Sequence, residues 1–243
     1  MMSACIRAEN RKLRGSAVWP VFFVLPLISA AYGTFNYLMN QGILSNSWYD
    51  LYTQHTLFYA LFFFSSMVGI YCAYLWRLEH KGHNWNLIMT APVKPIYLFL
   101  AKEVVVLKMA LLTQIWVFVL YVVCGKLFAG LSGWPPVQLI FWMMRGTLAA
   151  VPIVALQLLL SMVIRSFAVP VFIALFGSVT GMLVGQKYGM FWPYALMMMG
   201  MNANKTEDML AGGAAGFVLS CVLFTLLFAT LAALVLKKRD VRA

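Results

Sequence analysis

Few residues in the sequence could carry chemistry, and most of them lie far apart along the chain. Three ionisable residues, Lys102, Glu103 and Lys108, fall inside one long apolar stretch, where charges are functional candidates by default. They include no nucleophile, and a lysine near the end of an apolar helix can extend its charged group to the polar interface. We therefore expect interfacial lysines here and predict no catalytic residue.

Ligands for a metal are equally scarce. A short segment holds four methionines, whose thioethers can bind Cu(I), but no histidine or cysteine stands near them, so we interpret them as adaptable apolar surface. Two histidines near position 80 lack a third ligand, and the four cysteines form no C-x-x-C pair, so neither a metal site nor a disulfide is predicted. The residues are Met197, Met198, Met199 and Met201, then His80 and His83, and Cys5, Cys72, Cys124 and Cys221.

Common motifs of nucleotide binding and hydrolysis are missing. The sequence contains no G-x-x-x-x-G-K-[ST], so the chain cannot bind ATP through a P-loop. It also contains neither H-E-x-x-H nor G-x-S-x-G. We expect no enzymatic activity and no cofactor bound by this chain.

The elements that position these residues must be membrane helices. Of the 243 residues, 63% are hydrophobic and only 10% are charged, against about 25% charged in ordinary soluble domains. A soluble chain of this length cannot hide so much apolar surface from water. The composition excludes a soluble enzyme, a disordered chain and a disulfide-stapled secreted domain, and it predicts an all-α polytopic membrane protein.

Six segments contain the roughly 20 mostly apolar residues that a spanning helix needs. The basic stretch 1–16 precedes the first of them and is expected to form a short helix in the membrane interface. We expect a single membrane domain over 1–243, with sizeable loops at 77–95 and, on the opposite side, at 186–212. The predicted spans are Ala17–Met39, Gln54–Trp76, Ile96–Cys124, Gly146–Ile164, Ala168–Gly185 and Gly213–Leu236.

Basic residues divide unevenly between the two sides that six spans define. Lys and Arg number 18 against 7 Asp and Glu, an excess that we attribute to basic loops on one face of a bilayer and not to nucleic acid binding. The positive-inside rule places the basic side, and with it both termini, in the cytoplasm. That side holds Arg7, Arg11, Lys12, Arg14, Arg77, Lys81, Lys94, Lys102, Lys108, Arg165, Lys237, Lys238, Arg239 and Arg242, whereas Lys126, Arg145, Lys187 and Lys205 lie on or near the other side.

The loop 77–95 has the pattern of a short amphipathic helix. Asn84 is a good N-cap residue, and Trp85, Ile88 and Met89 would then share one face of the helix. Pro92 would end it. Such a helix between two spans either rests on lipid or docks in a groove of a soluble partner, and the composition favours neither.

The fifth predicted span carries a stripe of glycines at Gly177, Gly181 and Gly185. Residues four apart lie on one face of a helix, and without side chains they allow another backbone to approach closely. The stripe is expected to pack either within one subunit or between two subunits.

Three stretches, in their order along the chain, resemble the permeases of type-2 ABC exporters in the lantibiotic-immunity group. The first is Glu9–Arg14, which runs into a span that contains Pro26. The second reads Glu-His-Lys-Gly-His-Asn-Trp-Asn-Leu from Glu79, then Ala-Pro-Val from position 91, and continues to Tyr97 and Lys102. The third is the turn at 158–166, followed by Pro170. With six spans, the resemblance covers the whole chain.

This resemblance implies a non-catalytic permease subunit in a bacterial cell membrane. ATP would bind a separate pair of ATPase subunits docked under the loop 77–95, and a second permease chain, identical or paralogous, would complete the path. The cargo would be a membrane-active, amphiphilic peptide antibiotic expelled from the membrane. The residues implied in coupling to the ATPase are Glu79, Lys81, Gly82, Trp85, Leu87, Ile88, Met89 and Pro92.

Two other functions stay open. A permease of the same architecture could move a drug, a lipid-linked molecule or a polysaccharide, because apolar helices recognise amphiphiles by shape and leave no signature residues. A stand-alone membrane enzyme or assembly factor would instead need a polar cluster with a reactive group, and the cluster at Lys102 has no nucleophile.

Overall fold

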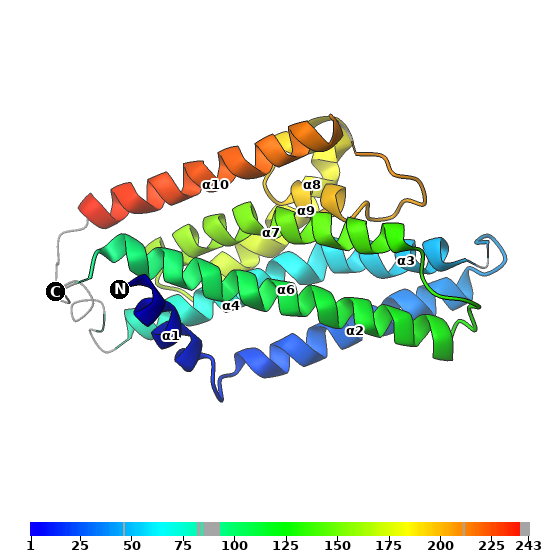
Figure 1. Ribbon diagram of the computed structural model, residues 1–243, viewed down its shortest axis with the longest axis horizontal. Coiled ribbons are helices and arrows are strands. Elements are labelled where there is room, and N and C mark those ends of the chain that lie inside the picture. The colour runs from blue at the N-terminus through cyan, green and yellow to red at the C-terminus, as the bar shows by residue number, and fades with distance from the viewer. Residues whose placement is uncertain (46, 82–83, 85–92, 211, 239–243) are drawn as a thin grey trace.

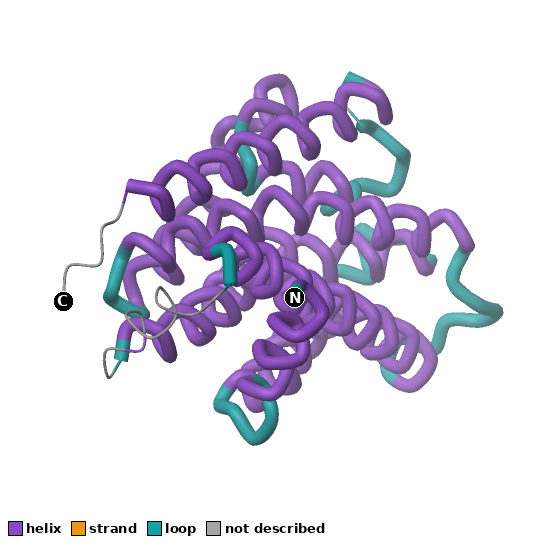
Figure 2. The backbone as a smooth tube through the Cα atoms, turned by 60° about the vertical axis from the view of Figure 1, so that its left-hand side comes forward, coloured by secondary structure: helices purple, strands orange, loops and turns teal. Residues whose placement is uncertain are grey.

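Apolar stretches of the chain form long helices, and every regular element in the described residues is helical (Figure 2). The computed structural model describes residues 1–45, 47–81, 84, 93–210 and 212–238, with the backbone alone at 185–187 and 238. The elements are α1 (Met2–Lys12), α2 (Val18–Met39), α3 (Trp48–Phe58), the π-helix η1 (Tyr59–Phe63), α4 (Phe64–His80), α6 (Pro95–Leu127), α7 (Val137–Val163), α8 (Ala168–Tyr188), the 3-10 helix η2 (Gly189–Phe191), α9 (Ala195–Gly200) and α10 (Gly213–Lys238). The all-α prediction is confirmed.

Five helical segments of the described chain are long and apolar enough to cross a membrane. They are α2, the continuous segment of α3, η1 and α4, and then α6, α7 and α10. The helix α8 is apolar over Ala168–Val184, which is shorter than the others. The sixth span therefore remains a prediction.

Two helices begin earlier than their predicted spans, and both differences have a polar cause. The second span starts at Trp48 instead of Gln54, because Ser47 caps it: the Ser47 hydroxyl accepts from the backbone N–H of Asp50, 3.2 Å away. The fourth starts at Val137 instead of Gly146, directly after Pro136. It continues through Arg145, because that side chain donates to the Gly200 carbonyl and pairs with Asp208.

The two ends of the bundle differ in what they hold. At one end lie α1, the end of α4, the start of α6 and the last turn of α10 (Figure 1). We call this the termini end and the other the far end. The loop from α2 to α3 and the loop from α6 to α7 are at the far end. The described ends of the predicted loop 77–95, at 77–81 and 93–95, therefore lie at the same end of the bundle as α1 and the last turn of α10.

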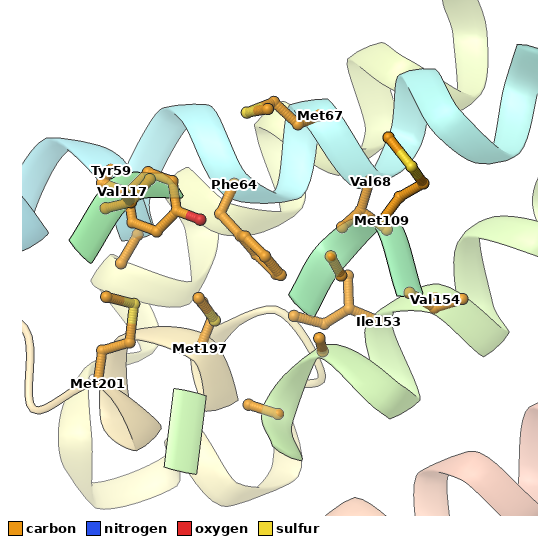
Figure 3. Close-up of a cluster of buried hydrophobic side chains, with 14 of the residues drawn as sticks. Tyr59, Phe64, Met67, Val68, Met109, Val117, Ile153, Val154, Met197 and Met201 are labelled. Atoms are coloured by element: carbon orange, nitrogen blue, oxygen red, sulfur yellow. The ribbon is translucent and has the colours of Figure 1, made fainter. Parts of the chain in front are cut away.

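The core is where α4, α6, α7 and α9 meet. Phe64 and Val68 from α4 face Ile153 and Val154 from α7 in Figure 3, and all four are buried. Met197, in the short helix α9, points into the same core and is also buried. Burial of such side chains in contact with one another is the main cohesive feature of the bundle interior.

The first two glycines of the predicted stripe lie against the segment between α8 and α9 in the same chain. A Cβ added at Gly177 would stand 2.4 Å from the ring of Tyr194, and one at Gly181 would stand 3.1 Å from the backbone nitrogen of Ala195. Gly185 lies further along α8. After the end of α8 the chain turns back and packs against this helix, and Gly177 and Gly181 leave room for the returning segment.

We predict that Gly177→Ala destabilises the protein although alanine is the better helix former. Tyr194 cannot move aside easily, because it is buried and accepts a hydrogen bond from Gln157 Nε2 at 2.5 Å. We expect a loss of about 1–3 kcal/mol, typical of overpacking, measured as a lower unfolding temperature in detergent. Gly216→Ala is the matched control, because its Cβ would stand 3.5 Å from Met190, and that variant should be neutral or slightly stabilised.

Candidate functional site: a buried ion cluster at the termini end

Four charged side chains from three helices meet at the termini end. Glu9 and Lys12 come from α1, Glu79 from the last turn of α4, and Lys102 from the early part of α6. We call these four residues the ion cluster. Two of its members flank the predicted loop 77–95 in the sequence, since Glu79 is near the end of α4 and Lys102 is near the start of α6.

Lys102 is the centre of the ion cluster. Its ammonium lies 2.7 Å from Glu9 Oε2 and 2.7 Å from Glu79 Oε1. It also donates to the Leu75 carbonyl at 3.3 Å and stands over the ring of Trp76, 5.1 Å from its centre. All the donor capacity of the ammonium is therefore used inside the protein.

Lys12 closes the ion cluster from the α1 side. Its ammonium lies 2.6 Å from Glu9 Oε1 and also pairs with Glu79. Burial lowers the pKa of Lys12, but the carboxylates of Glu9 and Glu79 raise it further, and the net result is a pKa above the ordinary value. Lys12 is thus charged at neutral pH, and two ammonium groups face two carboxylates with no net charge.

Burial makes these pairs energetically important. Lys102 is 0% exposed, Glu9 is 1% and Glu79 is 3%. Charged groups so far from water are stable only when paired, and removal of one partner from a buried pair typically costs about 3–5 kcal/mol. The ion cluster therefore holds α1, α4 and α6 together as one unit, even though a buried pair adds little net stability by itself.

Local sequence explains how each helix presents its charge. Glu9 and Lys12 are three residues apart and so share one face of α1. Pro95 stands at the first turn of α6, where its missing N–H costs nothing, and Lys102 follows about two turns later on the buried face of the helix. A second link joins the same helices, because Lys108 donates to Asn10 of α1.

The structure corrects the interpretation of Lys102 as an interfacial lysine. Its side chain does not extend to solvent, because two carboxylates inside the bundle take its charge. Glu103 is buried as well, whereas Lys108 is exposed. His80 lies at the end of α4, and its Nε2 forms a hydrogen bond with the Ser161 carbonyl oxygen, 2.9 Å away.

The predicted coupling residues fall into two groups. Glu79 belongs to the ion cluster, and Lys81 is exposed directly after α4. The others, Gly82, Trp85, Leu87, Ile88, Met89 and Pro92, lie outside the described residues. Sequence reasoning missed the partnership of Glu9 and Lys12 with Lys102. The available signal was a lone carboxylate at Glu9 within an otherwise basic segment.

We predict that Lys102→Met detaches α1 from α6, because it leaves two buried carboxylates with only Lys12 between them. The measurement is the rate at which a membrane-permeant maleimide alkylates Cys5 in α1, since the other cysteines are buried. We expect a clear increase in Lys102→Met and no comparable change in Lys108→Met, which loses an exposed contact on the same helix. Equal rates in both variants would show that the ion cluster does not hold α1.

The comparison with known proteins agrees with this architecture. Neither a curated protein nor a solved structure matches the chain significantly. The family model described as ABC-2 family transporter protein matches residues 5–181. The matched region is well over half of the chain and contains all four residues of the ion cluster. The protein therefore belongs to the ABC-2 transporter family, and it is a multi-pass permease of the cell membrane.

Proposed function

We propose that this permease works in an ATP-driven exporter, with the termini end in the cytoplasm and six spans. The observation that carries the proposal is the ion cluster, because it joins the two helices that flank the loop 77–95. Members of the ABC-2 family associate with an ABC ATPase. An ATPase docked at 77–95 would thus press on α4 and α6 at the point where they are bound to each other.

The ion cluster gives a physical route for this coupling. Glu79 is one residue from the end of α4, and Lys102 is in the second turn of α6. Since Glu79 is buried, its proposed role is to position the helices and not to touch the ATPase. Trp85, Ile88 and Met89 are the proposed contacts, because they would share the apolar face of a helix in the loop.

The cargo that we propose is an amphiphilic peptide antibiotic, moved by two permease chains. The support is the resemblance of Glu9–Arg14, of the stretch from Glu79 to Lys102 and of the turn at 158–166 to lantibiotic-immunity permeases. The chain itself would not hydrolyse ATP, because its sequence has no P-loop.

The orientation is tested by cysteine labelling in intact cells. Single cysteines are placed at Asn46, Asn204 and His83 in a variant without native cysteines, and an impermeant maleimide is added from outside. We expect labelling at Asn46 and Asn204 only, because basic loops remain in the cytoplasm. Labelling at His83 in unbroken cells would reverse the proposed orientation.

The coupling is tested with Trp85→Ala and Glu79→Gln, both assayed with the co-expressed ATPase. We expect Trp85→Ala to lose most of the co-purifying ATPase, because it removes the largest apolar side chain of the proposed contact. Glu79→Gln should keep the ATPase bound but lose cargo-stimulated ATP hydrolysis, since it weakens the connection between α4 and α6.

A matched control for these two variants is Lys126→Met, at the far end of α6, which should behave as the wild type. If Trp85→Ala and Glu79→Gln both retain wild-type binding and stimulation, the loop 77–95 is not the coupling element. The contact would then have to be sought near Arg165 or at the termini.

A further inference from the structure

A small cavity lies where α8, α9 and the loop after α9 meet α3. Its volume is about 200 Å³. This is enough for a charged head group and the first carbons of a chain, but not for a drug-sized ligand. The lining residues are Leu57, Gly181, Met182, Ala195, Met198, Met199, Ala203, Asn204 and Lys205.

The methionine run that stood out in the sequence is divided between two places. Met197 and Met201 point into the core of the bundle (Figure 3) and are buried. Met198 and Met199 line the cavity instead. Thioether side chains adapt to ligands of different shape, so this wall suits an apolar chain better than a rigid polar molecule.

One charged group, Lys205, lines this largely apolar cavity. The ammonium of Lys205 is buried and makes no hydrogen bond with any described residue. The nearby carboxylate of Asp208 is engaged by Arg145, with distances of 3.0 and 3.2 Å. Burial lowers the pKa of Lys205, because partial loss of hydration disfavours a cation.

We propose that this cavity binds the anionic head of a lipid-like amphiphile, with one oxyanion on Lys205 Nζ and the start of an apolar chain against Met198 and Met199. The ligand chemistry is a carboxylate or a phosphate attached to an acyl chain. A small hydrophilic anion would lose its hydration to a mainly apolar lining and gain one partner, whereas an amphiphile also buries apolar surface.

Membrane placement favours the same ligand. The chain is a multi-pass membrane protein, and the loop with Lys205 joins α9 to the start of α10, the end of α10 remote from the termini. The lipids of the surrounding membrane are therefore a source of such a ligand. This site is independent of the proposed peptide cargo, because it requires neither the ATPase nor export.

The test is ligand retention by the purified protein, measured by native mass spectrometry from nonionic detergent micelles. Four probes are compared: oleate and its uncharged counterpart oleyl alcohol, and dioleoyl phosphatidic acid and its uncharged counterpart dioleoylglycerol. The variants are Lys205→Met, Lys205→Arg and the matched control Lys126→Met, whose lysine already donates to the carbonyls of Leu131 and Gly133.

We expect each anionic probe to bind at least about ten-fold more tightly than its uncharged counterpart. One charge-assisted hydrogen bond is sufficient for an affinity difference of that size. Lys205→Met should remove that difference, while Lys205→Arg and Lys126→Met should keep it. If oleate binding depends on Lys205, the ligand is a free fatty acid. If phosphatidic acid binding depends on Lys205, the ligand is a phospholipid. Either result supports the proposal.

Two results would overturn it. One is equal retention of anionic and neutral probes by the wild-type protein, a comparison that needs no variant to fold. The other is unchanged preference for the anions in Lys205→Met. Folding of that variant is checked by its unfolding temperature, which should not fall, because methionine suits an apolar wall and the ammonium that it replaces bonds with no described residue.

Discussion

The buried ammonium of Lys102 constrains the arrangement at the termini end. A cation with no exposure must find anions within the protein, and the two that it finds come from different helices, α1 and α4. The chain can therefore seat α6 in this position only when α1 folds back on it and α4 ends beside it. A pairing requirement at one atom thus sets the mutual position of segments that are far apart in the sequence.

The far end is held by other interactions than a buried ion cluster. There the chain relies on close approach of small residues and on single polar links, such as Arg145 with the Gly200 carbonyl and Asp208. The pKa of Asp208 lies below its ordinary value: burial raises it, but the hydrogen bond and charge of Arg145 lower it further. That carboxylate stays ionised at neutral pH and ties the loop before α10 to α7. Lys205 in the same loop is the exception, because its ammonium bonds with none of the residues that the structure describes.

A permease needs a part that moves as a unit and a part that can receive a ligand. The ion cluster supplies the first, because α1, α4 and α6 cannot separate without leaving a buried charge unpaired. The cavity at Lys205 has the features of the second, with adaptable methionine walls and one available charge. The two lie in different parts of the protein, so binding at one and movement at the other would communicate only through the helices between them.

The sequence by itself determined the class of the protein. Composition and the length of apolar stretches are sufficient to predict an all-α membrane protein, because lipid accepts only helices or closed barrels. The span α2 was predicted with nearly its observed bounds, since its apolar run has clear ends. Two helices with a polar residue in their first turns, Asp50 in α3 and Arg145 in α7, were predicted too short. Asp50 is bound by Ser47 at the helix cap, and the partners of Arg145 lie elsewhere in the chain.

Only the tertiary structure decided what the charges do. Lys102 near a helix end reads as an interfacial lysine in any one-dimensional pattern, and nothing local distinguishes it from the exposed Lys108. The difference arises because Glu9 and Glu79, which are distant from Lys102 in the sequence, lie beside it in the folded protein. Likewise, Lys205 became a candidate binding residue only when folding enclosed its ammonium and assigned Asp208 to Arg145. The partners of a buried charge depend on three-dimensional packing, and residue type and spacing along the chain do not specify them.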